Sequence, residues 1–142
     1  MNPVPENTRP SALPPVVDNT LLGNALAAGA RLVEAGRIPE SVLREDSGAY
    51  ALCLLVKDGD AIVRTLAAGE SVDVGREAEW PVDDGWMSRR HFRIFIAPDG
   101  TPAIADLGAR NGTFVNDKAV EGTRTLLRGD VIRAGKTVFL FL

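Results

Sequence analysis

The sequence predicts an all-β fold, an eleven-stranded antiparallel β-sandwich with an N-terminal helical extension. From residue 49 onward, short runs rich in valine, isoleucine, leucine and phenylalanine recur. Turn-forming pairs such as Asp58-Gly59, Asp99-Gly100 and Asn111-Gly112 separate these runs, as expected between short strands. A chain of 142 residues with 45% apolar content can enclose one full core. We therefore expect a single β domain over residues 48–142.

The residues before this domain divide into two segments. Residues 1–17 contain five prolines, a composition that suits neither a helix interior nor a core and predicts a disordered leader. Residues 18–47 form the predicted helical extension, where apolar residues recur at helical spacing from Asp18 or Asn19 as N-cap to Gly36 as the stop. Two interpretations remain open, a helix that covers its own domain and a helix that docks on another chain.

The predicted strands are all short and apolar. They lie near residues 49–56, 61–66, 71–75, 80–82, 91–97, 102–106, 113–116, 118–121, 124–127, 130–133 and 137–142. Strands at this density are typical of an antiparallel sandwich. Within them, Cys53 is expected to be a small buried hydrophobe and Trp80 a core residue.

Charge and composition exclude several classes of function. The net charge of -3 gives no overall field that would attract nucleic acid or an anionic membrane, so any anion recognition must be local. The N-terminus lacks the features of a secretion signal, and no run is long and apolar enough to span a membrane. We therefore expect a cytoplasmic protein. No metal-ligand spacing, phosphate-binding glycine loop or carboxylate pair stands out, which argues against a metal, a cofactor and an enzyme.

Three motifs lie in turns between the predicted strands. They are Val74-Gly75-Arg76, then Ser88-Arg89-Arg90-His91-Phe92, then the run from Asp106 to Asn116. In this order and spacing, they resemble the forkhead-associated (FHA) family over about two thirds of the chain, from Tyr50 to Leu142. The resemblance implies an eleven-stranded β-sandwich whose loops at one end bind phosphothreonine peptides.

The resemblance also assigns ligand contacts. It implies that Arg76 and Ser88 contact the phosphate, that Asn111 holds the peptide backbone, and that Arg89 and Arg110 line the phosphate site. The chemistry of the ligand favours the same residues. A phosphothreonine carries about -1.5 to -2 charges and three acceptor oxygens, so it needs a permanent cation and hydrogen-bond donors on rigid turns. Arginine and serine supply both.

Other residues resemble family positions that brace the loops without touching the ligand. They are Gly75, His91, Gly112 and Asn116. The chain departs from the family at Ala109, where a serine is common, and so lacks one loop-bracing hydroxyl.

Several residues near the motifs have competing interpretations. Strand alternation would send Arg93 and Arg90 to opposite faces of the sheet, which excludes one continuous basic patch. His91 and Ser88 could form a base and a nucleophile, but the sequence offers no orienting acid or oxyanion donors beside them. Trp86, two residues before the serine, is a candidate specificity residue, and its alternative role is packing on its own loop.

Two functions follow from these observations. The first is a phosphothreonine-dependent interaction module that binds a partner phosphorylated in Ser/Thr kinase signalling. The alternative is a phosphate-independent scaffold or oligomerisation domain that uses the N-terminal helix or a sheet face.

Overall fold

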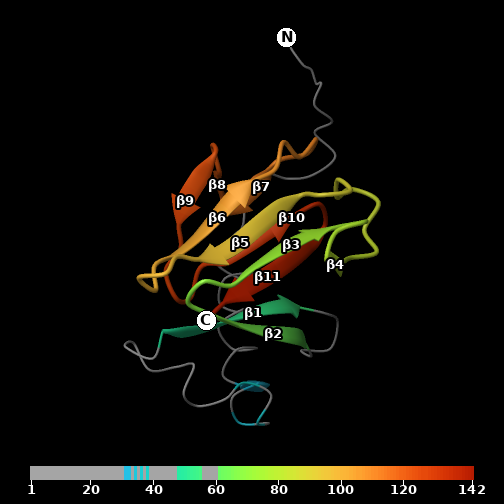
Figure 1. The fold of residues 1–142 in the computed structure, drawn as a ribbon. Helices are drawn as coiled ribbons and strands as arrows, with labels where there is room; N and C mark the ends of the chain where they lie inside the picture. Colours follow the sequence, from blue (N-terminus) through green and yellow to red (C-terminus); the bar gives the residue numbers. More distant parts are fainter. Residues whose placement is uncertain (1–30, 33, 35, 37, 39–47, 56–60) are drawn as a thin grey trace.

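The computed structural model describes residues 31, 32, 34, 36, 38, 48–55 and 61–142. Within them, eleven β-strands form two packed sheets, which confirms the predicted sandwich (Figure 1). Each predicted strand has a counterpart whose ends agree within two residues. In chain order they are β1 (Ala49–Leu55), β2 (Ala61–Ala67), β3 (Ser71–Gly75), β4 (Trp80–Pro81), β5 (Phe92–Ile96), β6 (Pro102–Asp106), β7 (Thr113–Val115), β8 (Lys118–Ala119), β9 (Thr123–Thr125), β10 (Val131–Ala134) and β11 (Thr137–Phe141).

The strand order explains why distant motifs meet. One sheet has the order β2-β1-β11-β10-β7-β8 and the other β4-β3-β5-β6-β9. Because β3, β5 and β6 are neighbours in antiparallel pairs, the end of β3, the start of β5 and the end of β6 lie at the same edge. The pair β3–β4 differs from the predicted antiparallel pattern because it is parallel, with Val74 beside Trp80.

The main core lies between the two sheets. Along β5, Phe92, Ile94 and Ile96 point inward and are buried, as the two-residue period of a strand requires. Phe92 meets Phe139 of β11 edge to face, with ring centroids 5.2 Å apart. Trp80 packs on Phe139 in the same way at 6.0 Å, which confirms its predicted place in the core.

A second apolar cluster lies on the outer face of the six-stranded sheet. It combines residues of β1, β2, β10 and β11 that point away from the main core with Leu32 and Ile38 of the N-terminal extension. Cys53 belongs to it and is fully buried, as predicted, and burial raises the pKa of its thiol to about 12. A thiol with so high a pKa stays protonated and unreactive at neutral pH.

The predicted extension is described only in part. Arg31, Leu32 and Glu34 have helical conformation, and Gly36 follows with a φ of +72°. The rest of the predicted helix and the predicted leader, residues 1–17, lie outside the described residues. Among the residues that are described, no helix is long and apolar enough to cross a membrane.

Candidate functional site

A pocket of about 340 Å³ lies at the edge where the ends of β3, β5 and β6 meet. Three separate stretches of the chain build its wall. The lining residues are Arg76, Gly85, Trp86, Met87, Ser88, Arg89, Arg90, Arg110 and Asn111. The structure therefore brings together all five residues expected to contact a ligand, and it adds Trp86 to the same wall.

Gly75 lets two backbone segments approach closely behind the pocket. A Cβ at this position would lie 2.3 Å from the Arg89 carbonyl oxygen and 2.8 Å from that of Ser88, so only glycine fits. Beside it, the Arg76 amide donates to the Ser88 carbonyl at 3.0 Å, and Arg76 Nε donates to the Met87 carbonyl at 2.7 Å. These bonds fix the Arg76 side chain and leave its two Nη groups for a ligand.

His91 is fully buried and joins two of the loops. Its Nδ1 accepts a hydrogen bond from the Ser88 amide at 3.0 Å, and its Nε2 donates to the Gly112 carbonyl at 2.8 Å. This pattern requires the neutral ring protonated at Nε2, and burial lowers the pKa of His91. The Nδ1 lone pair is directed at the Ser88 backbone instead of its hydroxyl, so His91 is not placed as a base for that hydroxyl.

Ser88 Oγ and Asn111 face the pocket with part of their hydrogen-bonding capacity unused. Ser88 Oγ accepts from the Arg110 amide at 2.9 Å, which leaves its own hydroxyl proton for a ligand. Asn111 is 8% exposed, and its Nδ2 donates to the Trp86 carbonyl at 2.8 Å. Its Oδ1 has no hydrogen-bond partner in the described part of the chain. This oxygen is itself buried, and a buried acceptor without a donor is costly.

Asp84 organises the loop that carries Trp86 and Ser88. Its buried carboxylate accepts from the Trp86 amide at 2.8 Å, from the Lys136 amide at 2.7 Å and from the Thr137 hydroxyl at 2.7 Å. It therefore ties the pocket wall to the turn between β10 and β11. No local pattern in the sequence marks this aspartate, because two of its partners lie more than 50 residues away.

The other predicted bracing residues serve different loops. Gly112 has a φ of +75°, and its amide donates to the Ala109 carbonyl at 3.2 Å, so backbone bonds close this turn without the missing hydroxyl. Asn116 lies in the β7–β8 turn with a φ of +49°. Its side chain donates to Asp130 Oδ1 at 2.8 Å and accepts from the Val131 amide at 2.9 Å. Asn116 thus braces the start of β10.

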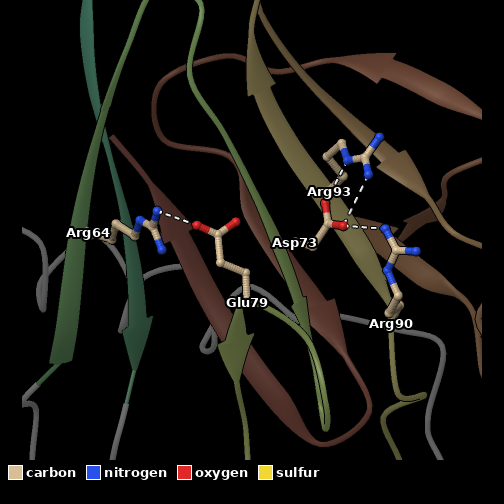
Figure 2. A network of polar contacts seen from close by, with 5 residues as sticks. All are labelled: Arg64, Asp73, Glu79, Arg90 and Arg93. Atoms are coloured by element: carbon tan, nitrogen blue, oxygen red, sulfur yellow. Dashed lines mark hydrogen bonds and ion pairs between the residues drawn. The ribbon is translucent and has the colours of Figure 1, made fainter.

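The arginines near the pocket differ in their partners. Arg90 and Arg93 both bind Asp73, and Arg93 Nε lies 2.6 Å from Asp73 Oδ1 (Figure 2). The prediction that Arg90 and Arg93 lie on opposite faces is wrong, because β5 begins at Phe92 and strand alternation does not extend back to residue 90. The hydrogen bond from Arg93 is the largest of several effects that lower the pKa of Asp73 to about 2.

The remaining cations have weaker partners or none. Arg89 lies 3.5 Å from Glu77, and both side chains are exposed. Arg76 and Arg110 have no carboxylate within 4.0 Å among the described residues. By contrast, Arg64 and Glu79, outside the pocket, pair at 2.8 Å (Figure 2). Unneutralised guanidinium groups beside hydroxyl and amide groups form a site for an anion.

Known proteins share this arrangement of strands and loops. The family model of the FHA domain matches residues 72–135, which contain all three motifs. An oxoglutarate dehydrogenase inhibitor from Corynebacterium efficiens is 34% identical over 111 residues, which cover 76% of this chain and 77% of the inhibitor. The chain belongs to the FHA family. The loops of this FHA domain that carry the pocket are therefore the loops that the sequence resemblance indicated.

Solved FHA domains have the same fold. The FHA domain of the CT664 protein from Chlamydia trachomatis is 30% identical, with a TM-score of 0.63, over 66% of this chain and 96% of that one. A second FHA domain, solved in a study of phosphothreonine-dependent FHA domain interactions, is 34% identical with a TM-score of 0.57. That match covers 66% of this chain and 94% of the other.

Proposed function

We propose that this FHA domain binds a phosphothreonine-containing segment of a partner protein, phosphorylated by a Ser/Thr kinase, in the pocket around Arg76 and Ser88. One observation carries the proposal. Two arginines without a carboxylate partner in the described region, Arg76 and Arg110, lie in one pocket with a serine hydroxyl that still has a proton to donate. The likeness to an FHA domain studied for phosphothreonine-dependent interactions supports it.

The proposed contacts to the phosphate use donors that have no partner within the described part of the domain. The Nη groups of Arg76 and the guanidinium of Arg110 would neutralise the phosphate, and the Ser88 hydroxyl would donate to one of its oxygens. Arg89 would add an outer charge, shared with Glu77. Asn111 Oδ1, which is buried in the free domain, would accept a backbone N–H of the bound peptide once its side chain turns toward the ligand. Three charge-assisted bonds of ~1.5–3 kcal/mol each, less the cost of association, are consistent with about micromolar affinity.

Binding without catalysis is the proposed mode of action. The family relative from C. efficiens is named as an inhibitor of an enzyme, and inhibition is a function that a binding module performs by occupying its partner. The hydrogen bond from the Ser88 amide to His91 Nδ1 supports the same view, because it uses the lone pair that a general base would need.

The scaffold alternative receives less support from the packing of the extension. Leu32 and Ile38 are buried against the six-stranded sheet of their own domain. Apolar side chains that cover their own domain are not available to a second chain. We infer that the extension stabilises the sandwich, and that partner binding depends on the pocket.

Paired peptides test the proposal. A library of phosphothreonine peptides identifies a ligand, which is then titrated beside its unphosphorylated and phosphoserine forms. We expect about micromolar affinity for the phosphothreonine form and at least about 100-fold weaker binding of unmodified threonine, because the charge-assisted contacts to the phosphate are lost. Equal affinity for the phosphorylated and unmodified peptides would overturn the proposal. Binding that needs residues 1–47 and ignores phosphate would establish the scaffold function in its place.

A further inference from the structure

Lys136 lies beside the pocket in the turn between β10 and β11. Its side chain is exposed, and its Nζ lies 5.2 Å from the centroid of the Trp86 ring. Trp86 forms part of the pocket wall, whereas Lys136 is not among the lining residues. A peptide that leaves the pocket across Trp86 would therefore meet an ammonium group at the rim.

Three features of the fold position Lys136 beside the pocket. Its amide donates to Asp84 Oδ2 at 2.7 Å, and the neighbouring Thr137 hydroxyl donates to the same oxygen. The preceding Gly135 has a φ of +59°, and a Cβ there would lie 2.6 Å from Asp84 Oδ2 and 2.8 Å from Met87 Cγ. The Trp86 ring attracts the ammonium through a cation–π contact. A side chain whose backbone is fixed and whose ammonium is already attracted to one place loses less conformational entropy when it binds a ligand.

The described carboxylates leave the Lys136 ammonium without an ion pair. Arg89 and Arg90 each have a carboxylate within 4.0 Å, whereas Arg76 and Arg110 do not. A phosphothreonine with about two negative charges would balance Arg76 and Arg110. Lys136 has no ion-pair partner in the region that the structure describes. A phosphothreonine alone would therefore leave one positive charge at the rim without a counter-charge.

We propose that the preferred partner segment carries an aspartate or glutamate within about three residues of its phosphothreonine, and that Lys136 binds this carboxylate. The inference rests on the proposed function, since it assumes that the phosphate occupies the pocket. An extended peptide advances ~3.3 Å per residue, so three residues reach ~10 Å from the phosphothreonine. The occupant is thus an acidic phosphopeptide.

A position scan with charge reversal tests this inference. Phosphothreonine peptides carry a single Asp, Asn or Lys at each of the three positions on either side of the phosphothreonine. Each is titrated against the wild type, Lys136→Glu and the matched control Lys118→Glu, a lysine that is also exposed but lies on β8 outside the pocket lining. We expect the wild type to prefer Asp over Asn by roughly two- to fivefold at one position, the range for an exposed ion pair.

The variants separate recognition by Lys136 from a general effect of charge. Lys136→Glu should prefer Lys over Asp at that same position, while Lys118→Glu keeps the wild-type order. The wild-type preference should shrink in 0.5 M salt because exposed ion pairs are screened. If phosphate dependence is intact but no position favours Asp, or if Lys136→Glu keeps the wild-type order, the inference is wrong and the proposed function stands. If the phosphorylated and unmodified peptides bind equally, both are wrong.

Discussion

Two groups of arginines in this molecule have the same chemistry but different surroundings. Arg93, on β5, and Arg90, in the pocket lining just before β5, share the carboxylate of Asp73 (Figure 2). In the same pocket, Arg76 and Arg110 have no carboxylate partner in the part of the chain that the structure describes. A paired guanidinium is already neutralised, whereas an unpaired one on a rigid turn can attract an anion. Partners, more than residue type, therefore separate the arginines of the candidate binding site from those of a surface ion pair.

The volume of a pocket does not by itself mark the candidate binding site. A larger hollow of about 550 Å³ lies on the sheet that carries Arg93 and Phe95. Its arginine is held by Asp73, and its lining offers no second cation. The smaller pocket is the better candidate because its polar groups converge with unused donors and acceptors.

Removal of one arginine from each group should give the largest contrast. Arg76→Ala is expected to weaken phosphothreonine peptide binding by about 10- to 100-fold, since one charge-assisted contact of ~1.5–3 kcal/mol is lost. Arg93→Ala is expected to change the affinity by less than about twofold. Isothermal titration calorimetry measures both. Equal losses in the two variants would break the comparison.

Mild acid should lower the stability of the domain through His91 before it affects the ion pairs of Asp73 with Arg90 and Arg93. His91 is the one histidine of the chain, and burial lowers its pKa. As the pH falls through about 6.5, the unfolded state binds a proton more readily than the folded state, so stability falls. Between pH 7.5 and 5.5 the loss is at most about 1.4 kcal/mol. Urea midpoints at the two pH values measure it, and the same dependence in His91→Gln would contradict the assignment.

Asn111→Ala probes the acceptor that lacks a donor. The variant loses the bond to the Trp86 carbonyl and the free Oδ1 together. We expect a three- to tenfold weaker phosphopeptide affinity, about the value of one neutral hydrogen bond. Thermal melting should show a folded domain. Unchanged affinity would remove Asn111 from the peptide contacts.

Asp73→Asn should have the smallest effect and should act on stability. The pKa of Asp73 is lowered to about 2, chiefly by its hydrogen bond from Arg93. A lowered pKa adds stability that is present above about pH 3.8 and is lost as the pH falls toward 2. Because this ion-pair network lies at the surface, we expect a loss of less than about 1 kcal/mol at pH 7. Denaturant titrations at pH 7 and pH 2.5 should show the difference between variant and wild type shrinking in acid.

Much of the fold could be predicted from local signals. Turn pairs such as Asn111-Gly112 and alternating apolar runs marked all eleven strands, because each depends on residues close together in the chain. The parallel pairing of β3 with β4 was missed. A strand of two residues carries too little pattern to reveal its direction.

The residues of the candidate site that lie in the three motifs could be predicted from the sequence. The segments with Arg76, Ser88 and Asn111 do meet in one pocket. The contributions of Asp84 and Lys136 were missed because their bond joins loops 52 residues apart. The shared partner of Arg90 and Arg93 was missed for a related reason, since it depends on where β5 begins. Contacts of this kind follow from tertiary structure, which no local pattern encodes.

The most direct measurement of the central claim observes the arginines themselves. Side-chain Nε–Hε resonances, assigned with Arg→Lys variants, are followed by NMR while a phosphothreonine peptide or its unmodified twin is added. We predict that the phosphopeptide shifts the signals of Arg76 and Arg110 and leaves that of Arg93 unchanged, and that the unmodified peptide shifts none of them. Shifts at Arg93 alone, or the same shifts with both peptides, would contradict the claim that the unpaired arginines form the phosphothreonine site.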